Sequence, residues 1–456
     1  MTLSKLPATA LAALIVVSAA LVPGTAHTVE FRLDGMYRFR ANLFDTLSLE
    51  RERDDTEGVR AYLDQRLRLT PHLRVGSNVH VYLDLDVMDG LRFGAQPEVL
   101  QAIGQVQDSG LAFDEPVALS GSVVPGSDYR ESLFVRRAWT ELYTPYVDVK
   151  LGRMGSHWGM GLLANDGNCD TCDYGDTVDR IMVSTSRLDP VRLSLAADTR
   201  AEGFINKDDD THSFLLTGGY MGEVHRLGGY VRWTRQPSNK FNVVHGDLWG
   251  KTKLGPLSLE LEALILWGKA ESTEIGVDDF KLLAGGGAFD ATLSMTPIEV
   301  NVQVGLASGD SDATDNAWHT FRFDRDHDVA LLMFEHPMPV YGQGDAADET
   351  NANIDASQVV TEEGVSNAFY LRPAFHFDIR DNLRVGVCVV AAWPVVKEAF
   401  SGSPTAYGAE IDLDATWRLY GTFELGGRAG FFFPGPVYGE DPDFTFGAEL
   451  RALVRF

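Results

Sequence analysis

The chain has 456 residues, with 39 basic and 65 acidic side chains and a formal net charge of −26. Three cysteines cannot staple a chain of this length, so a small disulfide-stabilised fold is excluded. The acidic balance argues against a nucleic-acid binder, which needs a positive surface. A mean hydropathy near zero leaves no room for a bundle of apolar membrane helices. The 45 glycines and the 10% of aromatic residues favour a β-barrel.

The N-terminus has the pattern of a secretory signal peptide. Lys5 supplies the positive charge, residues 8–22 form a mostly apolar stretch, and Gly24-Thr25-Ala26 is a small-residue cleavage site. We therefore predict a cleaved signal peptide at 1–26 and a single domain at 27–456. No later stretch of 18 apolar residues occurs, so the exported product is expected to be soluble or a membrane barrel.

The first segment after the signal peptide alternates with period two. Between Phe31 and Leu43, the odd positions are apolar or small and the even positions are mostly polar. Thirteen alternating residues exceed the five or six of an average soluble strand and satisfy the roughly 9–11 that a tilted membrane strand needs. The length therefore favours a strand that crosses a bilayer.

The same alternation recurs along the whole chain and predicts eighteen strands. They are expected at 29–44, 59–75, 79–88, 132–144, 146–154, 180–188, 191–199, 213–221, 225–236, 241–253, 256–268, 279–293, 297–307, 366–379, 382–392, 406–419, 421–433 and 443–456. Short turns alternate with mostly longer connections, which is typical of short periplasmic turns and long extracellular loops. We predict an all-β fold, a transmembrane antiparallel up-and-down β-barrel of 16 to 20 strands, in which 321–334 would add a further pair.

Two short stretches carry a resemblance to bacterial outer-membrane proteins. The ending Leu453-Val454-Arg455-Phe456 resembles their closing strand, which finishes on an aromatic residue, and 149–153 resembles the Gly-Arg strand ending of porin-like families. In size and strand number the chain resembles large porins and the alginate-export type of barrel. This resemblance implies the outer membrane of a Gram-negative bacterium, with membrane lipid and lipopolysaccharide as surroundings.

Strand parity assigns charged side chains to the barrel lumen. The expected pore-lining residues are Arg32, Arg38, Arg40, Arg66, Arg68, Asp84, Asp86, Glu260, Glu262 and Arg372. Arg136 and Arg137 are ambiguous, because parity supports either one facing inward. Two interpretations stay open. The lumen charges either pair with each other to hold the wall, or they form separate basic and acidic walls that orient polar or anionic solutes.

Two long loops are candidates for restricting the pore. Residues 97–106, in the loop 89–131, have the pattern of a short amphipathic helix with a proline at its start. The loop 308–365 carries thirteen acidic residues against two arginines, yet its run 329–334 is too apolar for a solvated loop. We expect ordered structure there, as a lid or plug.

Cys169 and Cys172 lie in a polar loop that is expected to face the oxidising exterior, which favours a small disulfide between them. Asp166, Asn168 and Asp170 have the alternate-oxygen spacing of calcium loops, but position 177 is Thr177 where a helix–loop–helix site needs glutamate. A looser calcium site and a plain polar turn both remain open. No other cofactor is expected.

The leading functional hypothesis is a porin-like channel for diffusion or selective passage of small polar, including anionic, solutes. The alternative is a dedicated exporter of an acidic polysaccharide, which would share the architecture. An enzyme is not expected, because no Gly-x-Ser-x-Gly motif occurs. Expected partners are therefore lipid, lipopolysaccharide and either small polar solutes or an acidic polysaccharide, with no nucleic acid.

Overall fold

The structure is a computed structural model that describes most of the chain after the N-terminus. The described residues are 28–45, 47, 49, 59–92, 133–185, 187–201, 210–238, 240–272, 277–311, 316–336, 338, 364–400, 402–439 and 441–456. The signal peptide expected at 1–26 and the loop helix expected at 97–106 lie outside them.

Nineteen strands form one sheet in the described chain. They are β1 (Val29–Phe44), β2 (Arg60–Val75), β3 (Val79–Arg92), β4 (Leu133–Tyr143), β5 (Val147–Gly155), β6 (Thr177–Thr185), β7 (Val191–Ala201), β8 (Thr211–Met221), β9 (His225–Gln236), β10 (Phe241–Leu254), β11 (Leu257–Ser272), β12 (Val277–Met295), β13 (Ile298–Ala307), β14 (Ala317–Trp318), β15 (Ala368–Arg380), β16 (Leu383–Pro394), β17 (Gly408–Leu419), β18 (Phe423–Pro434) and β19 (Thr445–Arg455). Apart from the two-residue β14, each strand matches an expected one, with ends that differ by at most four residues.

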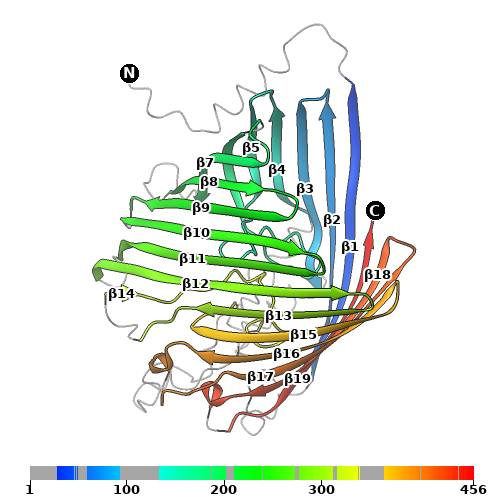
Figure 1. Cartoon of the computed structure of the whole chain (residues 1–456), viewed down its shortest axis with the longest axis vertical. Helices are drawn as coiled ribbons and strands as arrows, with labels where there is room; N and C mark the ends of the chain where they lie inside the picture. The colour runs from blue at the N-terminus through cyan, green and yellow to red at the C-terminus, as the bar shows by residue number, and fades with distance from the viewer. Residues whose placement is uncertain are drawn as a thin grey trace, which may run out of the picture.

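The sheet closes on itself through its first and last strands. Strand β1 pairs antiparallel with β2 on one side and with β19 on the other, in a register that places Met36 opposite Arg455. Figure 1 shows the two ends of the sheet meeting, with β1 in blue beside the last strands in red. The wall therefore has eighteen strands and no free edge, which confirms the expected antiparallel barrel.

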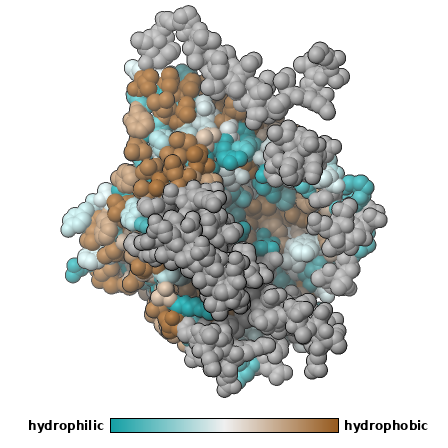
Figure 2. All heavy atoms as spheres, turned by 180° about the vertical axis from the view of Figure 1, so that it is seen from behind, coloured by the Kyte–Doolittle hydropathy of each residue, from teal (hydrophilic) through white to brown (hydrophobic). Residues whose placement is uncertain are grey.

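The outer face of the barrel is apolar because alternate residues of each strand point outward. In β15, Phe369, Leu371 and Phe375 are 37–41% exposed, whereas Tyr370 between them is fully buried on the inner side. Figure 2 shows apolar residues gathered in patches on one outer face of the molecule. This is the surface that a lipid bilayer accepts.

The extra strand pair that 321–334 would have formed is absent. In that range the structure has only an isolated bridge between Arg322 and Ser366, and the segment turns into the barrel. The described chain also contains two single-turn 3-10 helices, η2 (Lys397–Ala399) and η3 (Pro436–Tyr438). No helix in the part of the chain that is described is both long and apolar enough to span a membrane.

Candidate functional site

The connection between β5 and β6, residues 156–176, lies inside the barrel, and we call it the first inner segment. It had been expected to face the exterior. Arg38 and Arg66 reach it from the lumen face of β1 and β2, and both donate hydrogen bonds to the carbonyl of Cys172, at 3.2 and 2.8 Å. Since a buried carbonyl needs a donor, these arginines make the inward path favourable.

A β-bulge directs two consecutive arginines at the same segment. The register between β3 and β4 shifts so that Asp84 faces Arg137 and Leu85 faces Val135, which leaves Arg136 as the extra residue. Both guanidinium groups consequently point inward and donate to the carbonyl of Asp166, in the case of Arg136 at 2.6 Å. The ambiguity left by strand parity is thereby resolved, because both residues face the lumen.

Two glycines allow the first inner segment to approach Arg136 closely. Gly167 and Gly175 have φ values of +62° and +116°. A Cβ atom on Gly175 would lie 2.3 Å from Nη2 of Arg136 and 2.6 Å from the carbonyl oxygen of Asp166. Any other residue at position 175 would therefore push the arginine out of its place.

Asp173 is the counter-ion for the arginines of the first two strands. It pairs with Arg38 and, at 2.7 Å, with Arg40, and it lies 3.5 Å from Arg66. Burial alone would raise the pKa of this carboxyl, but the three guanidinium groups outweigh burial and hold its pKa well below the usual range. Asp173 thus stays ionised and keeps the first inner segment against β1 and β2.

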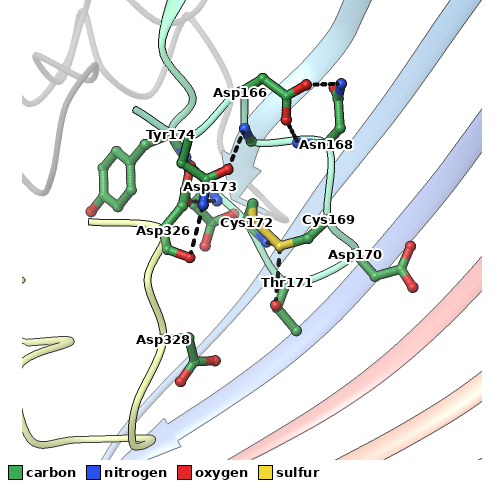
Figure 3. The surroundings of a disulfide bond; sticks show 12 residues. Asp166, Asn168, Cys169, Asp170, Thr171, Cys172, Asp173, Tyr174, Asp326 and Asp328 are labelled. Atoms are coloured by element: carbon green, nitrogen blue, oxygen red, sulfur yellow. Dashed lines mark hydrogen bonds between the residues drawn. A yellow bond between two sulfur atoms is a disulfide. The ribbon is translucent and has the colours of Figure 1, made fainter. Parts of the chain in front are cut away.

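The cysteine loop forms the tip of this segment (Figure 3). Cys169 and Cys172 are joined in a disulfide. The three oxygen-bearing residues of the expected calcium loop do not converge: Asp166 accepts a hydrogen bond from Asn168 at 2.6 Å, whereas Asp170 pairs with Arg455 of β19. Among the described residues, no group of three or more His, Cys, Asp or Glu side chains is placed to hold a metal ion.

Residues 319–336, between β14 and β15, also lie inside the barrel, and we call them the second inner segment. Their apolar run 329–334 is at most 6% exposed, which confirms the ordered structure expected there. The backbone N–H groups of Leu331, Leu332 and Met333 all donate to the carboxylate of Glu410, at 2.7–3.0 Å. The neighbouring Asp412 also accepts from Leu331, at 3.1 Å.

Two arginines complete the anchorage of the second inner segment. Arg428 of β18 binds the carboxylate of Asp328, at 2.7 and 3.2 Å, and Arg372 of β15 donates to the carbonyl of Val329 at 2.9 Å. Asp328 precedes the apolar run and Val329 begins it, so the two arginines fix the position of this run in the lumen.

The two inner segments meet at Asp326. One carboxylate oxygen of Asp326 accepts the backbone N–H groups of Asp173 and Tyr174, at 2.9 and 3.1 Å (Figure 3). The N–H of Asp324 donates to the carbonyl of Leu162 at 2.9 Å. Burial, together with the negative charges of Asp176 and Asp326, raises the pKa of Asp324 to about 7. The junction is therefore rich in carboxyl groups.

Six of the ten expected pore-lining residues contact an inner segment. They are Arg38, Arg40, Arg66, Arg68, Glu262 and Arg372. Asp84 and Asp86 instead neutralise Arg137 and Arg68 on neighbouring strands. Glu260 binds Lys251 at 2.6 Å, and Arg32 binds Asp34 near the end of the barrel that carries the short turns. That these residues line a conducting pore stays a prediction.

Two cavities lie inside the barrel beside the inner segments. The smaller, of about 510 Å³, is lined by carboxylate and amide side chains of β11–β13, including Asp290, Asn301 and Gln303, by Arg372 and His376 of β15 and by residues of both inner segments. The larger, of about 700 Å³, lies against β1–β6 and β8–β9. Its cationic lining residues are Arg68, Arg137, Lys150 and Arg180, and its acidic ones are Asp34, Asp84, Glu141 and Asp166.

Aromatic rings cover part of the wall of the larger cavity. Tyr82 stacks on Trp139, with ring centroids 4.8 Å apart, and His72 extends this stack on the other side of Tyr82 at 4.2 Å. Trp158 of the first inner segment contacts Tyr230 at 5.4 Å, and both also line the cavity. The cavity therefore offers guanidinium groups and ring faces together.

Sequence reasoning did not find three of the residues that organise this site. Glu410, Asp412 and Arg428 lie on the polar side of β17 and β18, and strand parity could have placed them in the lumen. Their partners are backbone groups and one aspartate of a distant loop, and backbone groups leave no signal in a sequence. The pairing could therefore be seen only in three dimensions.

Among the solved structures with this architecture are a porin and several other proteins of Pseudomonas. The chain is similar to a BenF-like porin from Pseudomonas fluorescens Pf-5, with a TM-score of 0.54 and 8% identity over 94% of this chain and 98% of that chain. It is similar to Pseudomonas aeruginosa OccK2 (OpdF) in complex with glucuronate, with a TM-score of 0.52 and 11% identity over 93% and 98%. It is also similar to Pseudomonas aeruginosa OpdK with vanillate, with a TM-score of 0.50 and 10% identity over 93% and 98%.

No family model and no curated protein matches the chain. At these low identities, the similarity to solved structures establishes the fold alone. The resemblance to large porins is confirmed at that level, whereas the resemblance to alginate-export barrels stays a prediction. The chain has the fold of an outer-membrane β-barrel of the porin type.

Proposed function

We propose that the protein is a bacterial outer-membrane channel that passes small polar solutes and favours those carrying a carboxylate. The observation that carries this proposal is the larger cavity, where Lys150, whose side chain is 36% exposed, lies on the same wall as Trp139 and Tyr82. An ammonium group attracts a carboxylate, and an indole ring stacks on the flat part of a solute.

The named ligands of two similar structures support this reading. Glucuronate is present with OccK2 and vanillate with OpdK, and each combines a ring with a carboxylate. In this chain, residues 27–456 would form the channel as a single domain after removal of a signal peptide at 1–26. Membrane lipid and lipopolysaccharide would surround it.

Solute flux into liposomes tests the proposal. Purified protein should admit glucuronate and vanillate several-fold faster than glucose, which is of similar size but uncharged. Trp139→Ala should reduce vanillate entry by about 5- to 10-fold, since one aromatic contact contributes about 1 kcal/mol. Trp417→Ala is the matched control, because Trp417 is 44% exposed on the outer face. Equal entry of glucose and glucuronate would contradict the proposed preference.

The alternative, an exporter of an acidic polysaccharide, would need a conduit for a continuous chain. In the described structure the two inner segments meet in the lumen, which does not favour it. Block of glucose entry by an added acidic polysaccharide, at concentrations where its monomer has no effect, would support export instead. No enzymatic activity is proposed.

A further inference from the structure

Two histidines and a tyrosine converge on the lumen wall, toward the end of the barrel that carries the short turns. His72 on β2 and His80 on β3 flank the turn 76–78, and their Nε2 and Nδ1 atoms are 3.1 Å apart. The phenol oxygen of Tyr82 lies 3.4 Å from the same Nδ1 atom of His80. All three side chains are only partly buried, so solutes in the lumen can reach them.

We propose that His72 and His80, with Tyr82 packed beside them, form a binding site for a late first-row divalent metal ion, Cu²⁺ in preference to Zn²⁺. Two imidazole nitrogens on one tetrahedral metal ion are about 3.3 Å apart, given bonds of about 2.0–2.1 Å. The observed 3.1 Å is close to this separation, so the rings need to rotate toward an ion but not to move apart. Imidazole suits Cu²⁺ and Zn²⁺, and Cu²⁺ binds more tightly to a given set of ligands.

The surroundings of this site compensate the charge of an ion. Glu141 faces His80 directly in the register between β3 and β4. Its carboxylate is held by Lys150 at 2.7 Å and by the indole N–H of Trp139 at 3.1 Å. Arg74, on the other side of His80, is paired with Glu30 at 3.5 Å. No unpaired positive charge in the described surroundings therefore opposes a cation.

A metal ion can replace the hydrogen bond between the two imidazoles without a change in their total number of protons. Without metal, one imidazole donates its N–H to the other. When the ion binds, the donating ring moves that proton to its other nitrogen, and both facing lone pairs become ligands. The exchange releases no net proton from two neutral histidines, and water would complete the coordination of the ion.

Calorimetric titration of the full chain, without a polyhistidine tag, tests the site. We expect one Cu²⁺ ion to bind tightly per chain, Zn²⁺ to bind more weakly and Mg²⁺ not to bind. Loss of an outer-shell partner already costs about 10–100-fold in affinity, so His72→Ala and His80→Ala should each weaken Cu²⁺ binding by at least that much. His225→Ala is the control, since the imidazole of His225 contacts a threonine, Thr252, at 2.7 Å. Wild-type affinity in either histidine variant would overturn the proposal.

Electron paramagnetic resonance of Cu²⁺ on the unaltered protein gives a second test that does not depend on how variants fold. The spectrum at one equivalent should show coupling to two imidazole nitrogens. Coupling to one nitrogen or to none would overturn the proposal. This site adjoins the wall of the larger cavity and shares Tyr82 with it. Metal binding and solute flux are measured separately, so the failure of either proposal leaves the other standing.

Discussion

The two inner segments are held inside the barrel by different kinds of contact. Each brings an irregular stretch of backbone into the barrel, where its polar groups need partners. The first inner segment is held by cations, because arginines of β1, β2 and β4 donate to its carbonyls. The second is held mainly through its N–H groups, which the carboxyl groups of Glu410 and Asp412 accept, and Arg428 adds one ion pair with Asp328.

The two kinds of contact differ in the charge that each inner segment must itself provide. Three of the guanidinium groups around the first inner segment, those of Arg38, Arg40 and Arg66, share the negative charge that the segment provides through Asp173. The carboxylates that hold the second inner segment are satisfied by neutral N–H groups and need no counter-ion from it. We therefore expect the first anchorage to depend on salt and charge, and the second to depend on the number of buried hydrogen bonds.

The largest effect is expected for Glu410→Ala. This change leaves three buried N–H groups of residues 331–333 without their main acceptor, and each lost partner costs about 1–3 kcal/mol. The second inner segment should leave its place, which raises single-channel conductance and lowers the free energy of unfolding by about 3 kcal/mol or more. Thermal unfolding and planar-bilayer recordings measure the two effects.

Asp414→Ala is the matched control for this change. Asp414 lies on the same strand and lines the lumen, but its carboxylate lies near His376, 3.6 Å away, rather than near an inner segment. Its removal should leave conductance close to that of the wild type. If both alanine variants raised conductance equally, the anchoring role of Glu410 would be wrong.

A smaller effect is expected for Asp173→Asn. The amide keeps the shape of the side chain but removes the charge that Arg38, Arg40 and Arg66 share. We expect a loss of about 1–2 kcal/mol at low salt, between the values for exposed and buried pairs, and a smaller difference from wild type in 1 M salt. Asp170→Asn is the control, because the pair with Arg455 is well exposed and should contribute below about 1 kcal/mol. A salt-independent loss would show that the first anchorage is not electrostatic.

The last effect concerns pH. Asp324 has a pKa raised to about 7, against about 3.9 in an unfolded chain, so the folded protein binds more protons between these values. Its contribution to stability is therefore fully present below about pH 4 and is lost as the pH rises through about 7. We expect the melting temperature of the wild type to rise from pH 8 to pH 5 relative to Asp324→Asn, in which this titration is absent. Parallel pH profiles for the two proteins would exclude Asp324 as the titrating group.

The barrel could be predicted from the sequence because its signal is carried by side chains. Period-two alternation, as in Phe31 to Leu43, fixes which residues face lipid, and the turns fix the ends of strands. The strand ends consequently differ from the expected ones by only a few residues. The strand pair expected at 321–334 was wrong, because the apolar residues of this segment are buried in the lumen rather than in a sheet.

The inner segments could be predicted only in part. The apolar run 329–334 predicted that this segment is buried. It could not predict the partner of the segment, because Glu410 is about eighty residues away. The inward path of 156–176 had an apolar signal in the run 158–164, where Leu162 and Ala164 are fully buried, but the contacts of its backbone carbonyls with arginine side chains left none. The two consecutive arginines at 136 and 137 were a further sign, because parity cannot place both in the lumen without a bulge.

The first inner segment also touches both strands at which the barrel closes. Asp173 pairs with Arg38 on β1, and Asp170 pairs with Arg455 on β19, the strand that completes the ring. These two partners are neighbours only after the last strand has joined the first. The segment therefore reaches its full set of contacts at the final step of assembly, and its docking stabilises the closed ring against reopening between its first and last strands.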